Sequence, residues 1–307
     1  MKALDEARAF YETYGAPMLH EQFPDWEGRI AVGLVGRGSE CFGFDDDTSR
    51  DHDFEGGFCL WLTDEDDAAI GVALERAYRA LPLEKAAQQS AMAEKSRGVR
   101  RISDFYRRYL GTPHAPEDWR QWLYLPSGAL AEATNGRVWR DELGAFTALR
   151  ETLLHGMPED VRRKKLAARA VEMAQSGQYN YARCLAHGEE GAAMLALADF
   201  VRAACGMIFL LNRRHMPYYK WMLRSLEELE ILGDLRGALD YLLTGENDAA
   251  GRQTKTGVVE DICAAVIREL KKQGLTQGDW DYLEPHSFQI QATIQRRELR
   301  AMHIMEG

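Results

Sequence analysis

The chain carries a glycine-rich turn directly after a short apolar run rich in β-branched residues, at 30–35. The turn reads GRGS over residues 36–39, and its glycines let the backbone approach a ligand closely. The backbone N–H groups of such a turn, together with the Ser39 hydroxyl, are donors that suit phosphate oxygens. We therefore predict that Gly38 and Ser39 bind the phosphates of a ligand.

Two acids follow the turn, because eleven residues separate Ser39 from the sequence Asp51-His52-Asp53. On an extended strand, residues two apart point to the same face, so both carboxylates lie on one side and His52 on the other. Crowded carboxylates repel unless a cation lies between them, and Mg²⁺ takes oxygen ligands and bridges carboxylates to phosphates. We predict that Asp51 and Asp53 bind Mg²⁺, with Mn²⁺ as the alternative ion. An EF-hand is excluded, because the required glycine, terminal glutamate and flanking helices are missing.

This arrangement resembles the nucleotidyltransferase superfamily, the fold of polymerase-β-like enzymes and aminoglycoside nucleotidyltransferases. Its signature is a Gly-Ser that opens a helix, a short spacer, an Asp-x-Asp and a third acid on a later strand. Gly38-Ser39 and Asp51-His52-Asp53 match the first two parts. A bacterial group catalogued as domain of unknown function 4037 is similar over longer segments, namely GSECFGFDDDTSRDHDF from residue 38, TNGRVWRDELGAFTALRETL at 134–153 and PYYKW at 217–221.

The resemblance implies a third acid on the strand just before a Gly-x-Val-x-x-Asp segment, which here is 136–141. We choose Glu132, because the residues around it read as a strand at 129–134 that leads into an Asn-Gly hairpin turn. A glutamate at this place suits a general base that takes a proton from an acceptor hydroxyl. Asp141 competes for the same role, and its alternative role is a turn or helix cap.

Positive charge offers two further candidates. Lys220 stands among aromatic residues, where it could bind a triphosphate or acidic substrate as a point charge. Equally, its stem could pack along the aromatic rings while its amine stays in water. We keep Lys220 as a nucleotide-binding candidate. The basic run at 162–165 begins a helical pattern, and we interpret it as a solvated helix face rather than a nucleic-acid patch.

The composition limits the class of protein. The 307 residues carry 38 Lys and Arg against 48 Asp and Glu, a net charge of −10, which argues against a broad grip on nucleic acid. No apolar run reaches the ~20 residues of a membrane span, and the N-terminus lacks a signal-peptide pattern. The five cysteines contain no CxxC and read as reduced thiols. These features predict a cytoplasmic protein without a membrane partner.

Hydrophobic periodicity predicts an α+β fold with two domains. Residues 1–155 form a small mixed β-sheet nucleotidyltransferase domain with flanking helices, and residues 156–307 form an all-α helical bundle that binds the acceptor. Helical spacing continues from residue 142 to the end without strand patterns. The elements expected before that point are helices at 3–14 and 64–81, the second capped by Thr63, a loop containing Pro17 and Pro24, and strands at 30–35, 58–62, 129–134 and 137–140.

The resemblance implies a Mg²⁺-dependent enzyme that moves a nucleoside monophosphate from a nucleoside triphosphate to a hydroxyl acceptor. The acceptor is a small molecule, a protein side chain or a tRNA end. The alternative is a non-catalytic nucleotide-binding or regulatory module, against which the paired acids argue, because binding alone needs no crowded carboxylates. A chain-elongating polymerase fits the acidic charge poorly. No pattern decides the oligomeric state, and a homodimer stays open.

Overall fold

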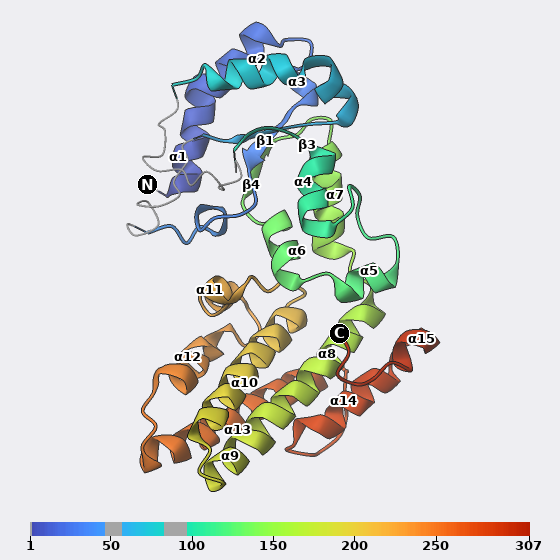
Figure 1. Cartoon of the computed structure of the whole chain (residues 1–307). Coiled ribbons are helices and arrows are strands. Elements are labelled where there is room, and N and C mark those ends of the chain that lie inside the picture. The colour runs from blue at the N-terminus through green and yellow to red at the C-terminus, as the bar shows by residue number, and fades with distance from the viewer. Residues whose placement is uncertain (1, 47–56, 83–96) are drawn as a thin grey trace. The chain divides into compact units, whose positions relative to one another are not determined.

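The computed structural model describes residues 2–46, 57–82 and 97–307. The chain divides into two compact units, each with its own core: residues 1–117 with 129–156, and residues 118–128 with 157–307. Residues 118–128, which the sequence analysis assigned to the first domain, thus pack with the second unit. Figure 1 shows the strands in the first unit and a set of long helices in the second.

A four-stranded sheet forms the centre of the first unit, with strand order β3-β2-β1-β4. The central strand β1 runs antiparallel to both β2 and β4, whereas β2 and β3 are parallel, so the sheet is mixed as predicted. All residues of β1 and β2 are buried, as expected for the two inner strands. The strands are β1 (Ala31–Leu34), β2 (Cys59–Leu62), β3 (Gly98–Arg101) and β4 (Arg137–Arg140).

Helices cover both faces of this sheet (Figure 1). Alternate residues of a strand point to opposite faces. Leu60 accordingly packs with the helices α1, α2 and α3, while Trp61 stacks on Phe146 of α7 at 4.0 Å between ring centroids. The helices of this unit are α1 (Ala3–Phe10), a π-helical turn (Tyr11–Gly15), α2 (Ala16–Gln22), α3 (Asp64–Arg79), α4 (Ile102–Leu110), α6 (Ser127–Thr134), α7 (Ala145–His155) and the 3₁₀ turns Glu27–Arg29 and Glu40–Phe42.

The strong local patterns are confirmed. Strands occur within the predicted segments 30–35, 58–62 and 137–140, and the helix predicted at 64–81 is α3. The Thr63 hydroxyl accepts a hydrogen bond from the backbone N–H of Asp66 at 3.1 Å, which is the predicted cap.

The strand predicted at 129–134 is wrong, because this segment is the helix α6. Its alternation of alanine and leucine fits a strand, but these residues are also strong helix formers. Leu130 and Thr134 are buried one helical turn apart, and the Thr134 hydroxyl donates to the Leu130 carbonyl at 2.7 Å. The Asn-Gly pair therefore joins a helix to β4 instead of closing a hairpin.

Two other segments near the N-terminal sheet differ from expectation. Pro17 lies in the first turn of α2 rather than in a loop, where its missing N–H costs little. The π-helical turn before it carries the helical path on from α1. The edge strand β3 was missed, because Arg100 and Arg101 break the apolar run that signals a buried strand.

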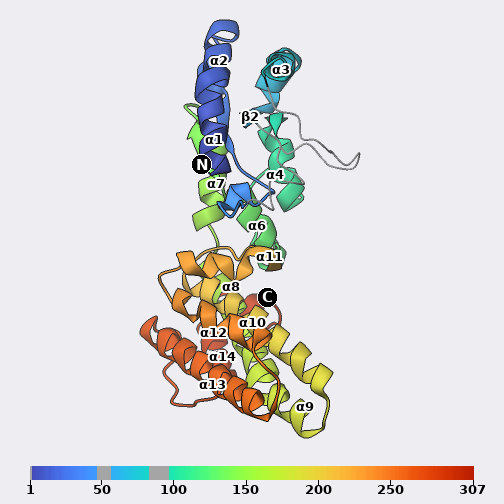
Figure 2. The same ribbon diagram turned by 90° about the vertical axis from the view of Figure 1, so that its left-hand side faces the viewer.

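All regular elements of the second unit are helices, and no strand occurs among its described residues, as predicted. Figures 1 and 2 show α8 and α10 side by side, and α14 packs against α8. Their buried apolar faces build a separate core. The helices are α5 (Trp119–Tyr124), α8 (Glu159–Met173), a π-helical stretch (Ala174–Tyr181), α9 (Ala182–Ala186), α10 (Glu190–Leu211), α11 (Tyr219–Met222), α12 (Arg236–Thr244), α13 (Ala249–Lys272), α14 (Leu283–Ala292), α15 (Arg297–Arg300) and the 3₁₀ turns Arg224–Glu228 and Gly233–Leu235.

Among the described helices, α10 is long and apolar enough to cross a membrane by length and composition. Most of its apolar window, 61%, is buried within the unit. Core helices of soluble proteins pass the same test, so this observation is weak evidence for a membrane span.

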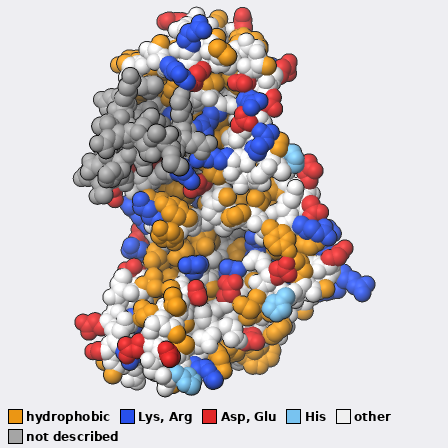
Figure 3. Space-filling model, viewed as in Figure 1, with side chains coloured by type: hydrophobic (Ala, Val, Ile, Leu, Met, Phe, Trp, Pro, Cys, Tyr) orange, Lys and Arg blue, Asp and Glu red, His pale blue; other side chains and the backbone are white. Residues whose placement is uncertain are grey.

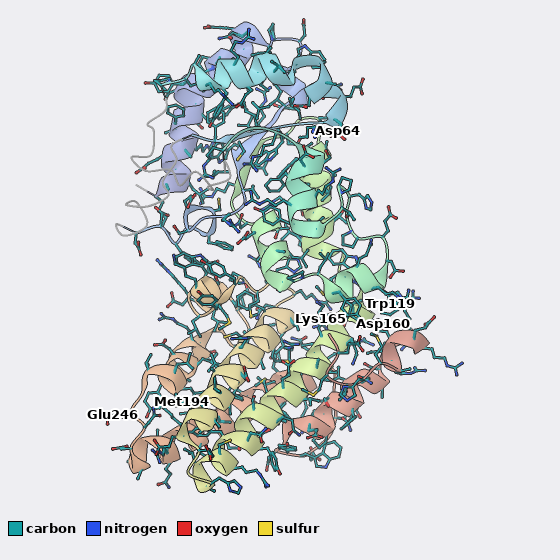
Figure 4. All side chains as sticks on the ribbon, viewed as in Figure 1. Asp64, Trp119, Asp160, Lys165, Met194 and Glu246 are labelled. Atoms are coloured by element: carbon teal, nitrogen blue, oxygen red, sulfur yellow. The ribbon has the colours of Figure 1, made fainter. Side chains whose placement is uncertain are left out.

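The basic run at 162–165 is not a solvated face. Arg162 and Lys164 of α8 are buried, and the Lys164 amine donates to the carbonyls of His303 and Ile304 at 2.6 and 3.1 Å. Burial lowers the pKa of Lys165, which Figure 4 labels on α8, to about 8. Lys164 therefore holds the C-terminal segment in place, and the buried Arg162 and Lys164 are poorly exposed to a polyanion.

Candidate functional site

The glycine turn at the end of β1 has a backbone that only glycine adopts readily. Gly36 and Gly38 have φ angles of +124° and +121°. A Cβ at Gly38 would lie 2.4 Å from the carboxylate oxygens of Glu40. Ser39 directly precedes the 3₁₀ turn Glu40–Phe42, and its hydroxyl makes no capping hydrogen bond to that turn. The Ser39 hydroxyl is therefore not committed to capping.

Asn135 fixes the conformation of this turn from a distant point in the sequence. Its side-chain oxygen accepts the Gly36 N–H and its side-chain N–H donates to the Gly36 carbonyl, both at 2.8 Å. The next residue, Gly136, donates its N–H to the Cys41 carbonyl at 2.8 Å. The Asn-Gly pair thus closes the glycine turn on the side of β4.

Gly136→Ala should lower the free energy of unfolding by about 2–5 kcal/mol. This is the cost of placing alanine in a left-handed backbone conformation plus the cost of overpacking at the added Cβ. Gly136 has φ +62°, and an added Cβ would lie 1.9 Å from the Leu34 carbonyl oxygen. Gly144→Ala is the matched control, because Gly144 has φ +75° but no atom within 4 Å of an added Cβ. Urea denaturation measures both, and equal losses would contradict the close contact.

A buried cation lies beside the glycine turn. Arg97 forms an ion pair with Glu40, and their side chains are only 5% and 12% exposed. The Nε and Nη1 atoms of Arg97 are buried without a hydrogen-bond partner in the described part of the chain. Unpaired buried donors are costly, and Arg97 carries two of them beside the turn.

Glu132 lies near the same turn, although on the helix α6 and not on a strand. Its half-buried carboxyl interacts electrostatically with Arg37 of the turn and with Arg108 of α4. Burial raises the pKa of Glu132, and the two arginines only partly offset this effect. The Tyr109 pKa is raised to about 12, by burial first and by Glu132 next, and the Tyr109 hydroxyl lies against Gly36. A carboxyl with a raised pKa suits proton transfer.

The predicted metal ligands Asp51 and Asp53 lie outside the described residues. Within the described ranges, no group of three or more His, Cys, Asp or Glu side chains could hold a metal ion. The fit of Mg²⁺ to this protein therefore rests on the oxygen-donor chemistry of Asp51 and Asp53 alone.

Asp141, the competitor of Glu132, caps a helix. Its two carboxylate oxygens accept hydrogen bonds from the backbone N–H groups of Gly144 and Thr147, at 3.1 and 2.7 Å, at the start of α7. Both oxygens are thus engaged with the backbone, which fits a structural role.

Lys220 belongs to the second unit. Its amine lies 4.8 Å from the centre of the Trp221 ring, and its neighbours Tyr218 and Tyr219 are exposed. Figure 3 shows hydrophobic side chains gathered over the α11 region. The surroundings combine a cation with aromatic rings. This suits either the binding of a nucleobase and a phosphate or the packing of the aliphatic stem of Lys220 along a ring.

Comparison with known families gives one match. Residues 122–222 match the family model described as "Domain of unknown function (DUF4037)". The matched segment includes Glu132, Asp141 and Lys220 but not the glycine turn. It confirms the resemblance to that group over these residues. No curated protein matches the chain, and no solved structure matches it.

Sequence reasoning missed Arg97 and Asn135. Arg97 precedes a strand without apolar character, so no local pattern singled it out. Asn135 was recognised as a turn residue, but its hydrogen bonds to Gly36 depend on the pairing of β1 with β4. Only the paired sheet brings these residues to the glycine turn.

Proposed function

We propose that the protein is a Mg²⁺-dependent nucleotidyltransferase that moves a nucleoside monophosphate from a nucleoside triphosphate to a hydroxyl acceptor. The observation that carries the proposal is the glycine turn beside Glu132, a carboxyl whose pKa burial raises. A phosphate-binding turn and a proton acceptor are two of the groups that this reaction needs from the protein, beside the ligands of the metal ion.

The glycine turn holds the triphosphate in this proposal. Gly36 and Gly38 present backbone without side chains, and the Ser39 hydroxyl donates to a β- or γ-phosphate oxygen. Arg97 offers its two unpartnered nitrogens to the same phosphates. Its ion pair with Glu40 then gives way to, or is shared with, the ligand.

Glu132 acts as the general base and takes the proton of the acceptor hydroxyl, which then attacks the α-phosphorus. Asp51 and Asp53 would hold Mg²⁺, which supplies neutralisation of phosphate charge when bound. Pyrophosphate leaves from the glycine turn. The second unit binds the acceptor, and Lys220 stays the candidate contact for the triphosphate or for an acidic group of the substrate.

Metal-dependent ligand stabilisation tests the proposal. Each of ATP, GTP, CTP and UTP is added with Mg²⁺ or with EDTA, and the melting temperature of the full chain is measured. At least one should raise the melting temperature with Mg²⁺ and not with EDTA. Incubation of that radiolabelled nucleotide with cell extract should then place label in a small-molecule, RNA or protein pool. No shift with any nucleotide would overturn the proposal.

Ser39→Ala should cost ~1–3 kcal/mol of triphosphate affinity, because it removes a hydroxyl that faces the phosphates while keeping the turn. The binding of the nucleoside monophosphate should change less, since that ligand lacks β- and γ-oxygens. Titration calorimetry with both ligands measures the difference. Equal losses would mean that Ser39 acts only through the turn's conformation.

One observation favours the second candidate, a nucleotide-binding or regulatory module without catalysis. The four described strands carry no acidic residue, whereas the superfamily signature has its third acid on a strand. Nucleotide binding with Mg²⁺ but without label transfer to any pool would select this candidate.

A further inference from the structure

A pocket of about 530 Å³ opens along the edge strand β4 of the first unit. Small-molecule sites have volumes in this range. Side chains from α1, β4 and α7 line this pocket. Its lining, taken over the described residues, includes neither residues 36–39 of the glycine turn nor Glu132. Its charged lining consists of Asp141 and four arginines, Arg8, Arg137, Arg140 and Arg150.

Two of these arginines are held rigidly. Arg140 is 20% exposed and pairs with Glu27 and Glu142, which balance its charge. Arg150 instead donates to the Thr134 carbonyl at 2.7 Å and forms a longer ion pair with Glu151, at 3.7 Å. Within the described chain, the Arg150 Nε has no hydrogen-bond partner. Arg150 is therefore held by a looser ion pair than Arg140.

The other two arginines are exposed, and each can exchange its present carboxylate partner for a ligand. Arg8 and its partner Glu12 are 56% and 58% exposed, and Arg137 and its partner Asp5 are 58% and 49% exposed. Ion pairs with this exposure are weak, so an incoming anion can replace the carboxylates at small cost.

The pocket offers donors and few acceptors. The oxygens of Asp141 are already bound to the N–H groups of α7. The indole N–H of Trp139, another lining residue, has no partner among the described residues. Guanidinium groups present paired N–H donors that match phosphate and carboxylate oxygens.

We propose that this pocket binds a small phosphate-bearing anion, held by Arg8 and Arg137 at its exposed side and by Arg150. The site is separate from the glycine turn. A phosphate group fits the donor set because its oxygens can accept from several guanidinium groups at once.

Calorimetry on the full chain in EDTA, with pyrophosphate and with citrate as probes, tests the proposal. These probes carry no nucleoside and the buffer holds no free metal, so the result does not depend on nucleotide transfer. Pyrophosphate should bind, and more tightly than citrate. Arg8→Gln and Arg137→Gln should each weaken it about tenfold, as expected for loss of a charge-assisted hydrogen bond.

Arg107→Gln is the matched control, because Arg107 is 50% exposed and paired with Asp104 in the same unit but away from the pocket lining. Arg107→Gln should bind pyrophosphate like the parent. Absence of binding, or an equal loss in the control, would overturn the proposal. Parental affinity in both Arg8→Gln and Arg137→Gln would place the probe outside this pocket and overturn the proposal as well. Tighter binding of citrate would overturn the preference for phosphate.

Discussion

Replacing Glu132 by glutamine should lower the rate of the proposed nucleotide transfer by ~10²–10⁴-fold, the usual contribution of a positioned general base. The affinity for the nucleotide with Mg²⁺ should stay nearly intact, because glutamine keeps the size and removes only the proton-accepting charge. Single-turnover transfer of labelled nucleotide and a separate binding titration measure the two quantities. If affinity falls with the rate and higher Mg²⁺ restores both, Glu132 is a metal ligand and not the base.

The pH dependence adds an independent readout. A general base works only when unprotonated, so the rate should fall as the pH drops through the raised pKa of Glu132. This acidic limb should lie above the range of an ordinary glutamate and be absent from the residual rate of Glu132→Gln. A raised pKa in the folded state also means that the protonated form stabilises the fold and that this contribution is lost as the pH rises. At neutral pH, Glu132→Gln should therefore keep or raise the melting temperature.

Asp141→Asn is the paired control for the choice of acid. Asparagine offers one acceptor oxygen where the carboxylate accepts from both Gly144 and Thr147, so the cap weakens by about 1 kcal/mol. The transfer rate should stay unchanged at temperatures where the protein is folded. A rate loss in Asp141→Asn with a fully active Glu132→Gln would show that Asp141 is the acid.

Asp51→Asn should weaken Mg²⁺-dependent nucleotide binding by ~100-fold or more, because even residues that only orient metal ligands contribute up to that much. The substitution removes one ligand charge and keeps the shape. The apo protein should melt at the same temperature or slightly higher, since the repulsion between Asp51 and Asp53 is relieved. Thermal shift with and without Mg²⁺ measures both effects.

Asp64→Asn provides the comparison for Asp51→Asn. Asp64, labelled in Figure 4, begins α3 and accepts a hydrogen bond from Ser103. It should bind nucleotide like the parent. Equal binding by Asp51→Asn and the parent would remove Asp51 from the metal site.

Local patterns predicted those elements whose signals are self-contained. The inner strands were predictable because a β-branched or apolar run shows in any window, and α3 because Thr63 and an acidic first turn mark its start. The helix at residues 127–134 was not predictable in this way. Alanine and leucine alternate there as in a strand, while their intrinsic propensity favours a helix. The tertiary setting decided between the two.

The candidate site divides in the same way. Gly38 and Ser39 were found because a glycine turn after a strand has a local signal. Glu132 was chosen through the resemblance. It lies near the turn, although it was predicted on a strand and belongs to the helix α6. Arg97 depends on contacts across 57 positions, to Glu40, which no sequence window contains.

The hydrogen bonds of Asn135 span 99 positions of the chain to Gly36. Contacts of such long range require a large loop to close, and they form late in folding. During synthesis, the closed conformation of the glycine turn therefore cannot form until β4 has left the ribosome and paired with β1. A nascent chain that stops before Asn135 holds the residues of the turn but lacks the hydrogen bonds that close it.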